Sequence, residues 1–452
     1  MPTELQTRPR ASPSPHEPQQ IGKYRVLAKL GEGATSEVFM CRDDFAERDV
    51  AVKLVRAVVL GDALDSRYIE RFFAAEAALV GRLQHPNIVQ LYDAVADPLR
   101  PYLVMEYVDG NTLRPYCSPD QLLPLELIVE LGFKCAMALG YVARQGVVHR
   151  DVKPANLLVE MTNGAITGIK ISDFGSALNL GSDLTHIDRV GSLAYASPEQ
   201  LEGERLDSRS DMYSLGAVLY HLIAGRPPLD AATPAAMMQQ IYHQRPESLV
   251  LLRAGVDPAL DALIQRALAK LPKDRFPDWD AFAQALADLV AKQLIPRGES
   301  QSVLDSERFT LLRQLEFFAE FGDVDLWDVV HRASWQRFLA GQSLYRKGDA
   351  GDSFHIIAQG EVEVFRDGDK VARLGAGTSV GEMAYLAPSA ALRKHSADVH
   401  VTKPTASVSF TPQTLARLNA TTRHAFDQAF IRVLVRRLHA AHESMAHPRR
   451  VL

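Results

Sequence analysis

The chain has 452 residues, of which 47% are hydrophobic and 23% are charged, with 50 Lys and Arg against 55 Asp and Glu. This balance is typical of soluble globular proteins, and the length predicts two or three domains. A formal net charge of −5, spread along the chain, argues against a nucleic-acid or anionic membrane surface as the main partner. Cys41, Cys117 and Cys135 form no CxxC pair, so we expect no disulfides or zinc site and favour a reducing cytoplasm.

No apolar run reaches the length needed to span a bilayer, so we expect no membrane segment. Residues 1–20 are rich in proline and poor in large apolar side chains, which predicts a disordered tail. Short apolar runs between residues 24 and 95 predict strands, with one helix over residues 68–83. A mostly helical stretch is expected from Leu122 to Lys292, interrupted by loops around residues 148–200.

The last third of the chain has a different pattern. A polar linker is expected over residues 293–308, followed by a helical pattern over residues 309–330. Period-2 alternation in FHIIAQ and EVEVFRD, with Gly360 and Gly368-Asp369 as turn signals, predicts a small β domain. A basic amphipathic helix closes this part.

Gly31 and Gly33 lie between two strand-like runs, a pattern typical of phosphate-binding loops and of simple hairpin turns. Lys53 shares a strand face with Ala51, and a lysine facing inward is costly unless its charge is paired. Glu76, on the apolar stripe of the following helix, is the candidate partner. The alternative is that Lys53 and Glu76 are unrelated charges.

The most specific pattern is His149-Arg150-Asp151, with Lys153 and Asn156 close behind and Asp173-Phe174-Gly175 downstream. With Met105–Gly110, Gly191–Glu199, Asp211 and Arg275 in the expected order, residues 24–290 resemble a protein kinase catalytic domain of the eukaryotic-like Ser/Thr kinases of bacteria. The resemblance implies an α+β bilobal fold, with a β-rich N-lobe at residues 21–105 and a helical C-lobe at residues 110–292. Glu199 and Arg275 are expected to form a buried structural pair, and Asp211 to support the catalytic loop.

The resemblance also implies ATP and Mg²⁺ and assigns roles to residues. It places the ATP contacts at Gly31, Gly33, Val38, Ala51, Lys53, Glu76, Glu106 and Val108. Asp173 and Asn156 are expected to hold Mg²⁺, Asp151 to accept the proton of the substrate hydroxyl, and Lys153 to steady the γ-phosphate.

Residues between Gly175 and Gly191 correspond to the activation segment of such kinases. Ser182 and Thr185 are the favoured sites of autophosphorylation, since Arg150 beside the base pairs with such a phosphate in the family. The alternative is that they are ordinary polar loop residues. Ser192 stands where a threonine usually supports the catalytic lysine.

The run from Leu344 to Leu386 resembles the cyclic nucleotide-binding domain, a β-roll with flanking helices. The resemblance implies that Gly381 opens a phosphate-binding cassette and that Glu382 takes the ribose hydroxyl of cyclic AMP or cyclic GMP. The phosphate-binding arginine is in doubt, because His395 stands at its position and Arg393 lies two residues earlier. The open alternative is a β-roll that has lost its ligand and serves docking or dimerisation.

We therefore expect a kinase domain at residues 21–292, a cyclic nucleotide-binding-like domain at 309–440 and a basic tail at 441–452. Protein substrates and nucleotide are the expected partners, and a homodimer is left open. The rival from another class is a pseudokinase scaffold, which the presence of Lys53, Asp151 and Asp173 disfavours.

Overall fold

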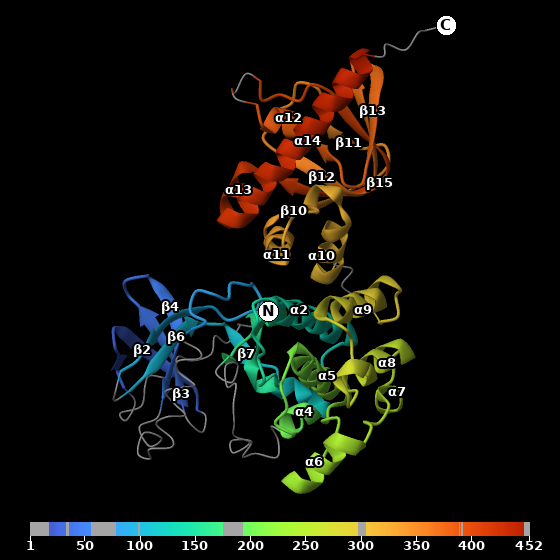
Figure 1. The fold of residues 1–452 in the computed structure, drawn as a ribbon. Helices are drawn as coiled ribbons and strands as arrows, with labels where there is room; N and C mark the ends of the chain where they lie inside the picture. Colours follow the sequence, from blue (N-terminus) through green and yellow to red (C-terminus); the bar gives the residue numbers. More distant parts are fainter. Residues whose placement is uncertain are drawn as a thin grey trace, which may run out of the picture. The chain divides into compact units, whose positions relative to one another are not determined.

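The chain is described here by a computed structural model, which covers residues 18–32, 36–55, 78–97, 100–174, 193–296, 304–387, 389 and 392–446. It forms two compact units, residues 1–301 and 302–452 (Figure 1). Within the described ranges, none of the helices is both long and apolar enough to cross a membrane.

The first unit begins with a six-stranded antiparallel sheet in the order β1-β2-β3-β4-β6-β5. Its strands are β1 (Gln20–Ile21), β2 (Tyr24–Glu32), β3 (Ser36–Asp43), β4 (Arg48–Val55), β5 (Leu91–Val95) and β6 (Tyr102–Glu106). Alternate side chains pack one apolar core that includes Tyr24, Phe39 and Val52. The last turn of the helix expected over residues 68–83 is not helical, because residues 78–82 form turns, with Gly81 at φ +73°. Residues 68–77 lie outside the described chain.

The rest of this unit is mainly helical, as expected. Its helices are α2 (Leu125–Arg144), α4 (Pro198–Leu201), α5 (Ser208–Ala224), α6 (Pro234–His243), α7 (Leu249–Leu252), α8 (Pro258–Ala267) and α9 (Trp279–Ala291), with single 3₁₀ turns at η2 (Arg114–Cys117), η3 (Pro119–Gln121), η4 (Pro154–Asn156) and η7 (Pro272–Asp274). Helices α2 and α5 are buried along most of their lengths, which explains their nearly continuous apolar sequences. Asp207 caps the N-terminus of α5, and Gly225, at φ +71°, ends it.

A small antiparallel sheet that the sequence analysis did not predict lies within the helical region. It is formed by β7 (Gly110–Thr112), β8 (Leu157–Thr162) and β9 (Ala165–Ile171), in that order. The His149–Asn156 segment precedes β8, and Asp173 follows β9. The sheet therefore brings the two charged motifs to neighbouring positions.

The second unit is a β-roll that is preceded and followed by helices along the chain (Figure 1). Its elements are α10 (Asp305–Gln314), η8 (Glu316–Phe318), α11 (Asp323–Arg332), β10 (Ser334–Phe338), β11 (Ser343–Tyr345), β12 (Phe354–Arg366), β13 (Asp369–Gly375), β14 (Ser379–Val380), α12 (Glu382–Tyr385), β15 (Asp398–Phe410), α13 (Pro412–Arg417) and α14 (Ala420–Ala446). The sheet order is β10-β15-β12-β13, with β11 on β15 and β14 on β12. Helix α14 confirms the predicted amphipathic helix and extends beyond residue 440, into the segment expected to be a tail.

The interpretation of Gly360 as a turn was wrong. Gly360 lies inside the continuous strand β12, at φ +95°, where the register with β15 shifts. A Cβ atom at this position would stand 2.4 Å from the Thr405 hydroxyl oxygen, so only glycine fits the bulge. Turns and bulges both use a positive φ, which is why the sequence did not separate them.

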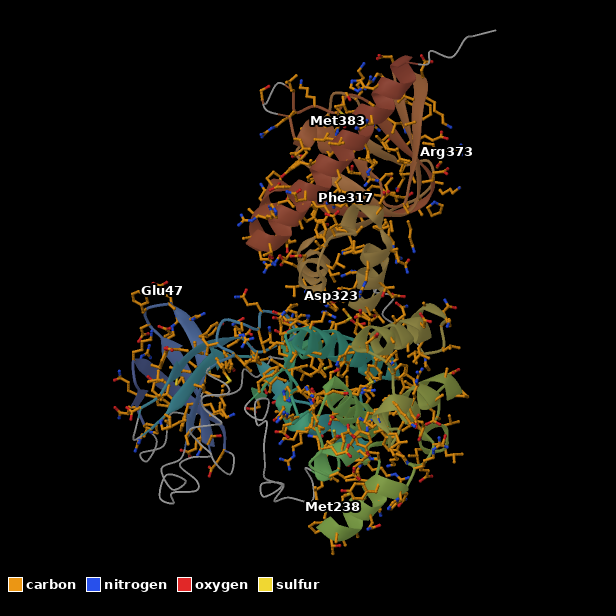
Figure 2. All side chains as sticks on the ribbon, viewed as in Figure 1. Glu47, Met238, Phe317, Asp323, Arg373 and Met383 are labelled. Atoms are coloured by element: carbon orange, nitrogen blue, oxygen red, sulfur yellow. The ribbon has the colours of Figure 1, made fainter. Side chains whose placement is uncertain are left out.

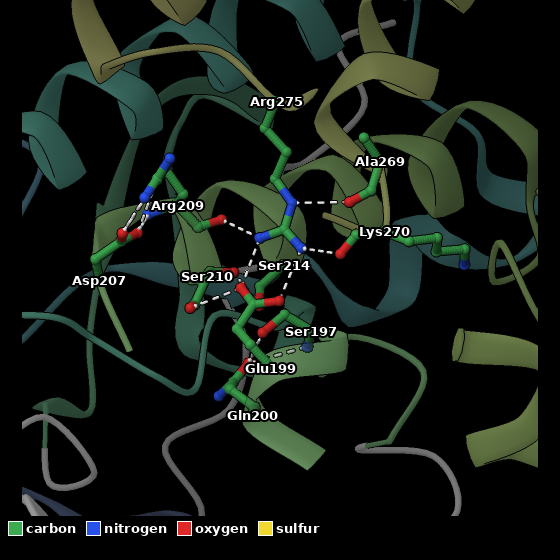
Figure 3. Close-up of polar contacts among 10 residues, drawn as sticks. All are labelled: Ser197, Glu199, Gln200, Asp207, Arg209, Ser210, Ser214, Ala269, Lys270 and Arg275. Atoms are coloured by element: carbon green, nitrogen blue, oxygen red, sulfur yellow. Dashed lines mark hydrogen bonds and ion pairs between the residues drawn. The ribbon is translucent and has the colours of Figure 1, made fainter. Parts of the chain in front are cut away.

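A buried ion pair joins distant parts of the helical lobe, as the sequence predicted (Figure 3). The Arg275 guanidinium donates to both carboxylate oxygens of Glu199, at 2.6 and 2.8 Å, and the side chains are 0% and 6% exposed. Arg275 also donates to the carbonyls of Ala269, Arg209 and Lys270, so its charge is fully compensated. Burial opposes ionisation of Glu199, but Arg275 outweighs it and lowers the pKa of the carboxyl.

Glu199→Gln should lower the free energy of unfolding of this unit by about 3–5 kcal/mol, because it leaves the Arg275 charge buried and unpaired. Because the pKa of Glu199 is lower in the folded state, its carboxylate stabilises the fold above pH 4.5, the ordinary carboxyl pKa. This stabilisation is lost as the pH falls through the pKa that Glu199 has in the folded state. Hydrogen exchange of peptides from α2, measured in the full chain, reports the unfolding of the first unit separately from that of the second.

The matched control is Glu247→Gln, because Glu247 pairs with Arg226 at 2.5 Å with both side chains about half exposed. An exposed pair contributes only about 0–1 kcal/mol. Equal losses in the two variants would contradict the assignment of a structural role to the buried pair.

Candidate active site

Lys53 lies on β4, between β3 and β6 in the middle of the first sheet. It is buried, and its ammonium group forms an ion pair with the carboxylate of Asp173, which follows β9. A buried lysine needs such a partner because the uncompensated charge would be costly. The structure thus gives Lys53 a partner that the sequence analysis had assigned to Mg²⁺; the expected partner Glu76 lies outside the described residues.

Asp173 is held in a strained and charged environment. Its backbone adopts φ +62°, which is unusual for a residue other than glycine. Burial opposes ionisation of its carboxyl, but the charges of Lys53 and Lys153 outweigh burial and lower the pKa. Asp173 is therefore an anion at neutral pH, as a ligand for a hard cation must be.

The catalytic-loop candidates converge on the carboxylate of Asp151. One of its oxygens, Oδ2, accepts hydrogen bonds from the Lys153 ammonium at 2.8 Å and from the Asn156 amide at 2.9 Å. The Asn156 amide also donates to the Asp151 carbonyl at 2.8 Å. With the amide nitrogen of Asn156 committed in this way, its Oδ1 atom is the part available to a cation.

The carboxylate of Asp211 holds the backbone of the catalytic loop, as predicted. This buried carboxylate accepts the backbone N–H groups of His149 and Arg150, both at 2.7 Å, and Arg150 has φ +67°. His149 Nδ1 lies 3.2 Å from the Asp151 N–H and its Nε2 lies 2.9 Å from the Ser172 carbonyl. These contacts require a neutral imidazole with its proton on Nε2.

The two charged motifs are connected directly. The backbone N–H and the hydroxyl of Ser172 both donate to the Asn156 carbonyl, at 2.9 and 3.1 Å. The rings of His149 and Phe174 lie 4.5 Å apart. Asp151, Asn156 and Asp173 are therefore brought to one place by contacts between neighbouring residues.

The predicted adenine-binding segment follows β6. The Glu106 carboxylate pairs with Lys170 at 3.1 Å, and the Glu106 N–H donates to the Gln90 carbonyl at 2.9 Å. An adenine contact from Glu106 would therefore have to come from its carbonyl. Val108 lies beyond the end of the strand, where the backbone has left the sheet.

Several predicted residues lie on or near the glycine loop and the activation segment. Gly31 pairs with Val38 across the β2–β3 hairpin, which agrees with both interpretations of this segment, and Ala51 is buried on β4. The predicted residues that lie outside the described chain are Gly33, Glu76, Ser182, Thr185 and Ser192.

One supporting residue was missed by the sequence analysis. The Gln200 amide donates to the Arg150 carbonyl at 2.8 Å, while Gln200 also completes a capping box with Ser197 at the start of α4. The Ser-x-x-Gln spacing signals the cap. It does not signal the contact with Arg150, which is fifty residues away in the sequence.

In the second unit, Gly381 and Glu382 lie together as predicted, with Gly381 at φ +87° before the short helix α12. The Glu382 side chain is only 2% exposed, and its carboxylate forms an ion pair with Arg437 of α14. Arg437 also donates to the Ser379 carbonyl at 3.0 Å. Arg437 was not predicted, because its charge is one of several in a basic helix.

The position of the expected phosphate-binding arginine is occupied by the buried His395. Its ring stacks on Tyr345 with centroids 3.8 Å apart, and burial lowers its pKa against the opposing effect of Asp349 and Asp352. Arg393 is exposed, and its Nε donates to the Ala387 carbonyl at 3.2 Å. The cassette thus holds a neutral histidine among carboxylates.

These residues fit one half of a cyclic nucleotide. Among the described residues, nothing donates to Glu382 Oε2 and nothing pairs with His395 Nε2, although both atoms are buried. Glu382 Oε2 could therefore accept a ribose hydroxyl. The phosphate half does not fit equally well, because His395 stands at the position expected for the arginine.

Comparisons with known proteins agree with this geometry. Residues 24–292 match the protein kinase domain family, and residues 335–421 match the cyclic nucleotide-binding domain. The chain is 37% identical over 305 residues to the serine/threonine-protein kinase PknB of Mycobacterium leprae, covering 65% of this chain and 47% of the relative. It is 38% identical over 273 residues to a probable serine/threonine-protein kinase of Streptomyces coelicolor, covering 58% of this chain and 39% of the relative.

A solved structure, the PknI kinase domain of Mycobacterium tuberculosis, aligns with a TM-score of 0.46 and 28% identity, covering 60% of this chain and 96% of that one. The chain spans about half the length of the curated relatives it matches. Its first unit carries the lysine, the catalytic-loop aspartate and asparagine, and the downstream aspartate in one site. This chain belongs to the protein kinase family and carries a cyclic nucleotide-binding domain after the kinase domain.

Proposed function

We propose that this chain transfers the γ-phosphate of ATP to serine or threonine hydroxyls of proteins. The observation that carries the proposal is the connection of Asp173 to the catalytic loop through Ser172 and Asn156. Together with the ion pair between Lys53 and Asp173, it supports a single site that contains Lys53, Asp151, Asn156 and Asp173. Asn156 Oδ1 and the Asp173 carboxylate would hold Mg²⁺, which neutralises phosphate charge when bound.

The residues of the site have separate tasks. Asp151 Oδ2 is occupied by Lys153 and Asn156, which orients the carboxylate and leaves Oδ1 to accept the proton of the substrate hydroxyl. Lys53, paired with Asp173 here, carries the charge that would bind the phosphates.

The conformation and surroundings of Gly31 are evidence for a nucleotide site next to the first sheet. Its φ is not in the left-handed region, and among the described residues no atom lies within 4 Å of a Cβ placed there. The fold itself therefore does not require glycine at this position. A ligand that approaches the backbone closely would require it.

Asp151→Asn should lower kcat by about 10²–10⁴-fold, because the amide cannot accept the proton. The KM for ATP should stay nearly constant, since Asp151 does not hold the nucleotide. Transfer of labelled phosphate to a basic acceptor protein measures both. The matched control is Asp230→Asn, which changes an exposed carboxylate of the same unit; a variant of Asp151 with native turnover would refute the assignment of the base.

We further propose that the enzyme phosphorylates its own activation segment at Ser182 and Thr185. Burial lowers the pKa of the Arg150 guanidinium despite the nearby Asp211, so an added anion close to Arg150 would be stabilised. Incubation with Mg-ATP followed by peptide mass spectrometry should find phosphate within residues 176–192. The Asp151→Asn chain should acquire none, and phosphate found only elsewhere would contradict the proposal.

For the second unit we propose regulation of the kinase by a cyclic nucleotide that binds weakly. Glu382 supplies an oriented ribose acceptor, whereas His395, neutral near pH 7 because burial lowers its pKa, is a poor phosphate ligand. The competing function is docking or dimerisation without a ligand. The replacement of the expected arginine by His395 favours that competitor over tight binding.

His395→Arg should tighten the binding of cyclic AMP or cyclic GMP by about 10–100-fold, the gain expected from a charge-assisted hydrogen bond. In the native chain, binding should strengthen as the pH falls below the ordinary histidine value of 6.5, because phosphate favours the protonated ring. Calorimetry on the full chain measures both effects. Arg393→Ala is the control and should change nothing; tight native binding that depends on Arg393 would overturn this assignment.

A further inference from the structure

Helix α14 changes its environment halfway along its length. In its first half, Thr422, Phe426, Ala429 and Phe430 are buried in their own unit. Phe426 belongs to an aromatic cluster that includes Phe317, which is labelled in Figure 2. This half is an ordinary amphipathic helix that packs on a core.

The second half contacts its unit mainly through charges. Arg432 pairs with Glu320, Arg436 pairs with Glu316, and Arg437 pairs with the buried Glu382. The side chains that this half directs toward its own domain are therefore largely guanidinium groups.

A stripe of large apolar side chains is left on another face of this half. Ile431, Leu434, Val435 and Leu438 are 42–57% exposed, and their spacing of three and four residues places them on one side of the helix. At about 100° per residue, the centre of this stripe lies about 130° around the helix axis from Phe426. We call these four residues the α14 stripe. An exposed apolar stripe of this kind marks an interaction surface.

The α14 stripe is symmetric along the helix. Ile431 and Leu438 are equally far from the midpoint between Leu434 and Val435. On the same face of the helix, Asp427 and His442, both exposed, are also equidistant from that midpoint. A helix with this arrangement presents a matching surface when a second copy runs in the opposite direction.

We propose that the α14 stripe is a homodimer interface in which two copies of α14 pair antiparallel about a two-fold axis between Leu434 and Val435. Ile431 then packs on Leu438 of the second copy, and Leu434 packs on Val435 of the second copy. Asp427 comes opposite His442 of the second copy, where its carboxylate accepts a hydrogen bond from the ring. Parallel pairing would instead place Asp427 against Asp427, which like charges disfavour.

Two single variants and their mixture test both the interface and its direction. Ile431→Glu and Leu438→Lys each place a charge against an apolar side chain at both ends of the two-fold interface. Each should raise the dimer dissociation constant at least about 100-fold. Sedimentation of the full chain over roughly 1–100 µM measures it, a range in which small interfaces typically dissociate.

An equimolar mixture of the two variants should recover a heterodimer, because the antiparallel arrangement brings the new carboxylate opposite the new ammonium. Leu251→Glu is the matched control: it changes a leucine that is 77% exposed in the first unit, and it should leave the dimer unchanged. Unchanged thermal unfolding of all variants establishes that the fold is intact.

A native chain that stays monomeric throughout this range would overturn the proposal and would leave the α14 stripe to another partner. A dimer insensitive to both single variants would place the interface elsewhere and also overturn it. Failure of the mixture to recover a dimer would rule out the antiparallel direction. None of these results depends on kinase activity or on cyclic nucleotide binding.

Discussion

The geometry of the kinase site depends on the buried carboxylate of Asp211. It binds two consecutive backbone N–H groups, those of His149 and Arg150, and so holds Arg150 in a left-handed conformation. That conformation costs a residue other than glycine about 1–2 kcal/mol, which two hydrogen bonds to an anion can offset. Because Asp151 is the next residue, its direction follows from this turn. Burial raises the pKa of Asp211 despite these contacts, so the anion itself needs both N–H groups.

Two ion pairs of the first unit differ in burial, and this difference distinguishes a structural pair from one that is accessible to a ligand. The Glu199–Arg275 pair is nearly inaccessible, and the remaining donors of Arg275 are taken by backbone carbonyls. It has no capacity for another partner and can only stabilise the fold. The Asp173 side chain, in contrast, is 37% exposed although its partner Lys53 is buried. The carboxylate of Asp173 is therefore accessible to a further partner, as its proposed role in holding a metal ion requires.

The sequence predicted the residues of the kinase site better than their contacts. Asp151, Lys153 and Asn156 lie within six positions of one another, so their order alone specifies a compact loop. The pairing of Lys53 with Asp173 joins residues 120 positions apart and depends on how β4 and β9 are placed. Apolar periodicity could show that Lys53 faces inward, but it could not show which carboxylate it meets.

In the second unit the unpredicted contacts are those of long side chains. Arg437 belongs to a basic helix whose charges look like a solvated face, yet it reaches the buried Glu382. Tyr345 covers His395 from a strand fifty positions earlier in the chain. In both cases the direction of the side chain is decided by tertiary packing, which residue type and spacing do not encode. The β12 bulge at Gly360 is a further example, since the same φ serves a turn.

Arg437 also connects the face of α14 that contacts Glu382 with the α14 stripe. Arg437 is adjacent to Leu438 and lies within one turn of Leu434, so the ion pair with Glu382 and the α14 stripe share one rigid helical segment. A ligand hydroxyl bound to Glu382 would donate a hydrogen bond to the same carboxylate that holds this segment. If such a ligand prefers one position of α14, dimerisation must change its affinity by the same factor, since coupling between two binding events is reciprocal. If the cassette binds a nucleotide and α14 pairs as proposed, Arg437 is the side chain that would connect occupancy of the cassette to assembly.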